Sequence, residues 1–150
     1  MKHDRVLMAF KLTSEVDDEV KRPEEFDLVK IIKNAEQQTI YDNCILCEIS
    51  VVSQSDSKLE QHHIAGKINF NDTITVCLEC HDFLSKHQKY WLPKKKSSLN
   101  RLSSYFYGWA DVFDLLHNKT GSSYFENLAN KFCSQAYHLR INSTKRRAIG

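Results

Sequence analysis

Apolar side chains recur at helical spacing through the second half of the chain. Between residues 97 and 120 they fall three or four positions apart, at Leu99, Leu102, Phe106, Trp109, Phe113 and Leu116. After Gly121 the same spacing continues, at Phe125, Leu128, Phe132, Ala136 and Leu139. The pattern predicts two helices that pack against each other as an αα-hairpin over residues 97–141. Since the aromatic residues lie on the apolar face, we expect them to form a core rather than a base-stacking platform.

The first forty residues have a weaker and more acidic pattern. A short apolar patch, residues 6–10, precedes a charged run, residues 14–19, and we expect a strand or frayed helix followed by a solvated acidic segment. Pro23 followed by Glu24 favours a helix start, because proline suits the first helical position and acids suit the N-terminal dipole. Helical spacing follows, at Leu28, Ile31, Ile32 and Ala35. We therefore expect an amphipathic helix over residues 23–39 that covers the middle of the chain.

The middle of the chain is built from shorter elements. Residues 58–64 predict a strand, Gly66 a turn, and residues 73–76, rich in β-branched side chains, a returning strand. The polar, serine-containing residues 50–58 predict a loop. A helix should begin near Cys80 and run to Trp91, because Pro93 cannot continue it. Two short strands and one helix are too small to hold a core alone, so a further stabilising element is expected here.

Cysteine spacing supplies that element. Two Cys-x-x-Cys pairs, Cys44 with Cys47 and Cys77 with Cys80, give four thiolates that can close a tetrahedral shell around one structural Zn²⁺. Metal binding would then contribute folding energy directly. The 29 residues between the two pairs are more than a plain zinc ribbon has, and they carry two adjacent histidines. The predicted fold class is thus α+β, with a small zinc-pinned module over residues 41–93.

The histidines suggest chemistry. His62 and His63 are consecutive on the predicted strand, so their side chains should point to opposite sides and serve different purposes. A third histidine, His81, directly follows the last cysteine. An imidazole, with a reference pKa of about 6.5, is suited to taking a proton from water near neutral pH. Two imidazoles can also hold a cation beside a phosphate.

These residues resemble the zinc-bound HNH endonucleases of the ββα-metal type. The similarity covers residues 41–93 and is carried by the cysteine pairs, the segment 59–66, Asn69 and the Cys77-x-x-Cys80-His81 start of a helix; Leu84, Ser85, Gln88 and Trp91 also match. The resemblance implies that His62 and His81 ligate a catalytic divalent metal, such as Mg²⁺ or Mn²⁺, and that His63 is the general base. It implies that Asn69 orders the loop between the strands, with Asn71 as the alternative. Many members have asparagine where this chain has Asp72, which is a departure.

The implied reaction is hydrolysis of phosphodiester bonds in DNA, leaving a 5′-phosphate and a 3′-hydroxyl; RNA is an alternative substrate. A second reading is a non-catalytic, zinc-stabilised nucleic-acid-binding module. Nucleic-acid contacts are expected from Lys67, His87, Lys94, Lys95 and Lys96, although the lysines could equally be ordinary solvated side chains. The flanking segments, residues 1–40 and the 97–141 hairpin, could serve a dimer or a partner protein.

Charge and cysteine content refine this picture. Lys and Arg number 7 against 10 Asp and Glu in residues 1–43, 7 against 6 in residues 44–96, and 7 against 3 in residues 97–150. A phosphate backbone should therefore meet the second half, which ends in a basic tail at residues 142–150. The fifth cysteine, Cys133, is expected to be a buried structural thiol. Reduced cysteines and the lack of a long apolar run predict a soluble intracellular protein, with no membrane partner.

Overall fold

The computed structural model describes residues 2–24, 26–53, 58–93 and 97–149. It contains six helices and one antiparallel pair of strands within those ranges. The elements in order are α1 (Lys2–Glu19), α2 (Leu28–Glu36), α3 (Ile45–Ile49), β1 (Leu59–His63), β2 (Thr73–Cys77), α4 (Leu78–Trp91), α5 (Ser98–Thr120) and α6 (Ser123–Ile149). The mixed architecture agrees with the α+β prediction.

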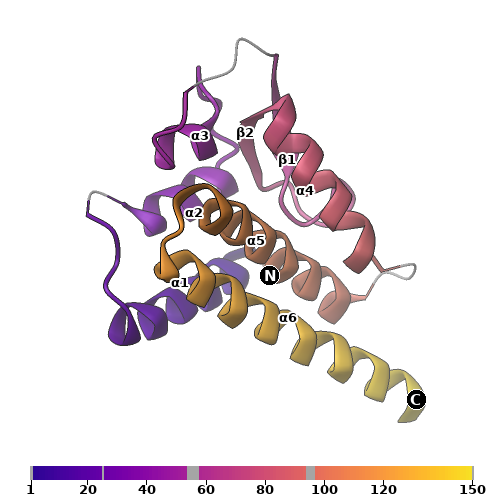
Figure 1. Ribbon diagram of the computed structural model, residues 1–150. Helices are drawn as coiled ribbons and strands as arrows, with labels where there is room; N and C mark the ends of the chain where they lie inside the picture. The colour runs from indigo at the N-terminus through magenta and orange to yellow at the C-terminus, as the bar shows by residue number, and fades with distance from the viewer. Residues whose placement is uncertain (1, 25, 54–57, 94–96, 150) are drawn as a thin grey trace.

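Helix α5 is the centre of the molecule. It pairs with α6 along its length, contacts α4 on another side and also meets α1 (Figure 1). The predicted aromatic residues form the core between α5 and α6. All five are buried: Phe106, Trp109, Phe113, Phe125 and Phe132. Gly121 ends α5 in the left-handed conformation, at φ 71°, and donates its N–H to His117 O at 2.7 Å. The hairpin prediction is confirmed, and the α6 backbone continues helically through the expected tail to Ile149.

The small sheet and α4 form the second layer. Strands β1 and β2 pair in antiparallel register, from Leu59 opposite Cys77 to His63 opposite Thr73. β2 is buried along its length, whereas β1 is partly exposed apart from His62. Helix α4 follows β2 directly, with Cys77 as its N-cap residue, and Figure 1 shows it beside the strands. The predicted strand, turn, strand and helix over residues 58–91 are therefore present, with the helix starting at Leu78.

The N-terminal prediction is confirmed in part and corrected in part: a helix was one of its two alternatives, and Asp17, Asp18 and Glu19 are exposed as expected. Residues 2–19 are helical throughout, and Val16, inside the expected solvated acidic run, is buried. The acidic side chains there make contacts: Tyr124 Oη donates to Asp17 Oδ1 at 2.7 Å, and Lys131 Nζ lies 3.1 Å from Glu15 Oε2. The run therefore helps to attach α1 to α6.

Helix α2 begins five residues later than Pro23 predicts. Asp27 is its N-cap, and the Asp27 carboxylate accepts a hydrogen bond from Lys30 N at 3.0 Å. A side-chain cap satisfies a free N–H at the first turn, which the proline signal cannot do. The expected apolar face is confirmed, since Leu28, Ile32 and Ala35 are buried.

Two further features differ from expectation. The short helix α3 directly follows Cys44, in a stretch where only a metal-binding pair was predicted. Cys133 is exposed, not buried, because it lies on the outer side of α6. Within the described residues, none of the helices is long and apolar enough to cross a membrane.

Candidate functional site

The four cysteines of the two Cys-x-x-Cys pairs converge in space. Their sulfur atoms all lie within 4.8 Å of one another, and all four side chains are buried. Cys47 Sγ lies 3.9 Å from both Cys77 Sγ and Cys80 Sγ. Zn–S bonds of about 2.3 Å in a tetrahedron place sulfur atoms roughly 3.8 Å apart, so this cluster fits one Zn²⁺. The cysteine cluster, Cys44, Cys47, Cys77 and Cys80, could therefore hold a metal ion such as zinc.

Local structure explains how the cluster forms. Cys44 and Cys77 are N-cap residues of α3 and α4, and Cys47 and Cys80 lie on the first turn of the same helices. Each helix thus places two thiols at its N-terminal end. Because α3 packs against β2, the two pairs meet.

The thiols of the cysteine cluster differ in how readily they ionise. Hydrogen bonding from Cys80 lowers the pKa of Cys44 to about 4, whereas burial and the neighbouring Cys44 raise the pKa of Cys47 to about 11. The pKa of Cys80 is also raised, first by its hydrogen bond to Cys44 and then by burial. Four sulfurs this close favour one thiolate that accepts hydrogen bonds from thiols, so a metal ion would have to displace the remaining protons.

Lys119, near the end of α5, faces the cysteine cluster. Its Nζ lies 4.0 Å from Cys47 Sγ. Burial alone would lower the pKa of Lys119, but negative charge on the neighbouring cysteines, Cys80 first and then Cys47, raises it overall. The ammonium group therefore offsets part of the negative charge that a four-thiolate zinc centre carries. Nothing in the local sequence predicts this contact, since 72 residues separate the two partners.

Beside the cysteine cluster lies a histidine cluster, which we define as Glu60, His62, His63 and His81. His62 is buried on β1, and its ring centroid is 5.5 Å from that of His81, on the first turns of α4. Burial, then the charges of His81 and His63, lower the pKa of His62 to about 3. His62 is therefore neutral near pH 7, which is the form in which imidazole binds metal ions.

His81 is oriented by a carboxylate that sequence analysis did not identify. Its Nδ1 lies 3.2 Å from Glu60 Oε2 and 3.5 Å from Ser85 Oγ. With Nδ1 engaged, Nε2 is the ring nitrogen left for another partner. Glu60 and His62 are two residues apart on β1, so alternation along the strand puts them on one face. That spacing was the signal that could have identified Glu60.

His63 is more accessible than His62 and is held by its backbone. Gln88, on α4, donates from Nε2 to His63 O at 3.0 Å, and Gly66 N donates to the same carbonyl at 3.2 Å. Burial, followed by the charges of Lys67 and His81, lowers the pKa of His63. The two adjacent histidines thus have different environments, as expected for consecutive strand residues.

The loop between β1 and β2 is tightly closed. Asn69 is buried and donates from Nδ2 to Ala65 O at 2.7 Å, while its own N–H donates to Gly66 O at 3.0 Å. Gly66 itself has φ 91°, a conformation that favours glycine. Asn71 is exposed, whereas Asp72 is buried and ion-paired. Of the two asparagines considered, Asn69 is the one bonded within the loop.

The expected nucleic-acid contacts are only partly brought together. Lys67 is exposed at the tip of the loop, close enough to influence His63. His87 is half-buried on α4, stacks on Phe83 with ring centroids 4.1 Å apart, and bonds through Nδ1 to Phe83 O at 2.9 Å. Lys94, Lys95 and Lys96 lie outside the described residues.

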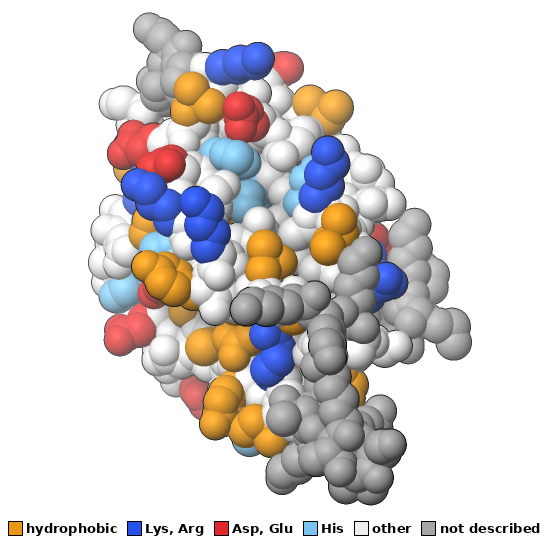
Figure 2. Space-filling model, turned by 90° about the vertical axis from the view of Figure 1, so that its right-hand side faces the viewer, with side chains coloured by type: hydrophobic (Ala, Val, Ile, Leu, Met, Phe, Trp, Pro, Cys, Tyr) orange, Lys and Arg blue, Asp and Glu red, His pale blue; other side chains and the backbone are white. Residues whose placement is uncertain are grey.

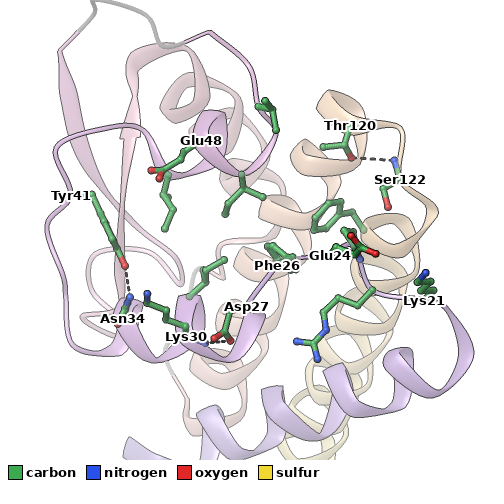
Figure 3. A pocket seen from close by; sticks show the side chains of 17 residues that line it. Lys21, Glu24, Phe26, Asp27, Lys30, Asn34, Tyr41, Glu48, Thr120 and Ser122 are labelled. Carbon is green, nitrogen blue, oxygen red and sulfur yellow. Dashed lines mark hydrogen bonds between the residues drawn. The ribbon is translucent and has the colours of Figure 1, made fainter.

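A groove of about 940 Å³ lies elsewhere, between α2, α3, the segment that links α1 to α2, and the turn from α5 to α6 (Figure 3). Apolar side chains, including Phe26, Ile45 and Phe125, line it together with charges of both signs. Tyr41 and Asn34 hydrogen-bond to each other at one side. The groove includes no member of the cysteine or histidine clusters, so its size does not make it the candidate site.

Comparison with known proteins adds no identification. No protein-family model, no curated protein and no solved structure matches this chain.

Proposed function

We propose that this protein is a metal-dependent HNH endonuclease that hydrolyses phosphodiester bonds in DNA. The observation that carries the proposal is the approach of His62 and His81, with ring centroids 5.5 Å apart, beside the accessible His63. Three imidazoles that differ in solvent exposure lie close together, on a strand and a helix that a zinc ion in the cysteine cluster could stabilise. This arrangement is what metal-assisted phosphoryl transfer requires: ligands for a cation and a separate base.

In this proposal the residues have distinct roles. His62 and His81 would hold a divalent cation, such as Mg²⁺ or Mn²⁺, which when bound offsets negative charge on the phosphate. Glu60 accepts from His81 Nδ1 and so directs Nε2 toward the cation, as carboxylates beside ligating histidines commonly do. His63 accepts the proton of the attacking water. The products would carry a 5′-phosphate and a 3′-hydroxyl.

The environment of His63 suits a base. Its lowered pKa keeps the ring unprotonated, and therefore able to accept a proton, at neutral pH. Gln88 and Gly66 both bond its carbonyl oxygen, which limits movement of the strand end. A fixed base contributes more to rate than a mobile one, since small displacements are costly.

Lysine side chains near the histidines could contact a polyanionic substrate. Figure 2 shows histidine side chains on one face of the molecule, with both basic side chains (Lys and Arg) and acidic side chains (Asp and Glu) near them. Lys67, Lys86 and Lys89 are exposed in this part of the chain, and Lys86 is ion-paired with Asp82 at 3.0 Å. Lysines at the rim would contact phosphates and position the strand without reading its sequence. His87, beside Lys86, would join this surface through its exposed edge.

The direct experiment is a cutting assay with zinc-loaded wild-type protein and supercoiled plasmid, in Mg²⁺, Mn²⁺ or EDTA. The proposal expects metal-dependent open-circle or linear product whose ends T4 ligase rejoins, as a 5′-phosphate and 3′-hydroxyl allow. A parallel reaction on RNA decides the substrate class. Folded protein that binds plasmid in every metal and never cuts would instead support the non-catalytic binding module.

A further inference from the structure

A buried ion pair joins α1 to the loop that leads into β2. Arg5 Nη2 lies 2.8 Å from Asp72 Oδ1, and Arg5 Nε lies 3.2 Å from the same oxygen. The two side chains are 3% and 1% exposed. The guanidinium carbon also lies 4.5 Å from the ring centroid of Phe70, and 5.7 Å from that of Tyr105. The pair is therefore enclosed and has little freedom to adopt another geometry.

Asp72 connects this pair to the histidine cluster. The backbone carbonyl of Asp72 accepts a hydrogen bond from Ile64 N at 3.0 Å. Ile64 directly follows His63 in the chain. A continuous path thus runs from Arg5 through Asp72 and Ile64 to His63, and it starts on a helix remote in sequence from the strands.

The Arg5–Asp72 ion pair fixes the orientation of α1 relative to the loop, rather than only filling space. Apolar side chains of similar volume can replace a buried ion pair with little loss of stability, so burial alone does not require these residues. What an apolar pair cannot supply is a fixed angle between α1 and the loop, because dispersion contacts have no preferred direction. Further hydrogen bonds to His63, from Gln88 and Gly66, come from α4 and from the loop itself.

We propose that Arg5 is a positioning residue for His63, acting through Asp72, and that α1 is therefore part of the scaffold of the site. The inference rests on the proposed function, in which His63 is the base. It assigns to the N-terminal helix a supporting role, in which Arg5 acts on His63 only through Asp72 and Ile64.

The test compares wild type with the double variant Arg5→Met, Asp72→Leu. This variant fills the space, leaves no unpaired buried charge and removes the directed bonds. Tyr124→Phe is the matched control, because it removes the bond from Tyr124 Oη to Asp17 Oδ1 and so loosens α1 at its other end. Zinc content and circular dichroism verify that each protein is folded.

Two readouts separate positioning from general stability. Hydrogen exchange of the Ile64 amide should be about tenfold faster in the double variant than in wild type, because its acceptor is no longer held. In plasmid cutting, kcat should fall by about tenfold or more, with KM changed by less than about twofold, because the base is misplaced while substrate binding is intact. Tyr124→Phe should change neither readout.

A folded double variant with wild-type Ile64 exchange and wild-type kcat would overturn the proposal. If the double variant does not fold, Arg5→Lys decides, since it keeps the charge but cannot reproduce the two-nitrogen contact. An increase of about threefold in Ile64 exchange is then expected, and no increase overturns the proposal. The exchange readout needs no cutting activity, so a failure of the nuclease proposal remains distinguishable from a failure of this one.

Discussion

Gly108, in the middle of α5, lies directly against the backbone of Ile64, the residue after His63. A Cβ atom at position 108 would lie 1.8 Å from Ile64 O and 2.6 Å from Ile64 C. Real Cβ atoms do not approach a carbonyl so closely, and backbone cannot rotate aside as a flexible side chain can. The absence of a side chain at Gly108 therefore lets the central helix support the strand that carries the histidines.

Gly108→Ala should consequently be strongly destabilising. We expect a loss of about 3 kcal/mol or more in the free energy of unfolding, at the upper end of overpacking effects, because a helix and a strand must separate. Urea denaturation monitored by tryptophan fluorescence measures it. Gly121→Ala is the control: a Cβ there meets open space, so the expected cost is the left-handed conformation alone, about 1 kcal/mol. Equal losses in the two variants would contradict the proposed contact.

Loss of one cysteine should unfold the region around the cysteine cluster. Cys77→Ser removes one of the four buried thiols that could hold zinc. We expect zinc content to fall well below one equivalent and the free energy of unfolding to fall by more than about 3 kcal/mol. Zinc is measured by plasma mass spectrometry after dialysis. Cys133→Ser provides the matched control, because that thiol is exposed and outside the cluster. A Cys77→Ser protein that retains full zinc and wild-type stability would rule out the four-cysteine site.

A pH dependence is expected from Asp111, on α5. Trp91 Nε1 donates to its Oδ2 at 2.7 Å, and burial raises the pKa of Asp111 to about 6. The unfolded value is near 3.9, so between these pH values the folded protein binds more protons than the unfolded chain. The contribution of Asp111 to the free energy of unfolding is therefore fully present below about pH 4, and it is lost as the pH rises through about 6.

Asp111→Asn removes this titration while retaining an acceptor for Trp91. Relative to the variant, wild type should lose up to about 3 kcal/mol in free energy of unfolding between pH 4 and pH 7. Urea denaturation at four pH values, with zinc content checked at each, gives the difference. Asp114→Asn, at an exposed position on the same helix, is the control and should show a smaller change. A constant difference between wild type and Asp111→Asn would contradict the raised pKa.

Local patterns were sufficient for much of the fold. The apolar spacing around Phe106 and Phe132 predicts the α5–α6 hairpin because both are core positions of long amphipathic helices. The cysteine pairs predict their own convergence, since the identity of the ligands restricts the geometry. The packing of helix α1 was harder to predict. Its second half is charged, which is typical of a solvated segment, but Asp17 and Glu15 contact α6. Cys133 was misjudged because it was grouped with its apolar neighbours, although the helical spacing of Phe132 and Ala136 leaves it off the apolar face.

The supports of the site are long-range contacts and were not predictable in the same way. Arg5 and Asp72 are 67 residues apart, and Lys119 and Cys47 are 72 apart. No periodicity or spacing connects such partners; they meet only once the helices have packed. Glu60 is different, because its position two residues before His62 on a strand was visible in the sequence.

The proposed role of His63 as the base of a metal-dependent nuclease is tested most directly by the rate at which His63→Ala nicks supercoiled plasmid in Mg²⁺ or Mn²⁺. We predict a rate at least about a hundredfold below wild type, with unchanged zinc content and plasmid affinity. His138→Ala, at an exposed position on α6, should cut at the wild-type rate. A His63→Ala protein that nicks plasmid as fast as wild type would contradict the account.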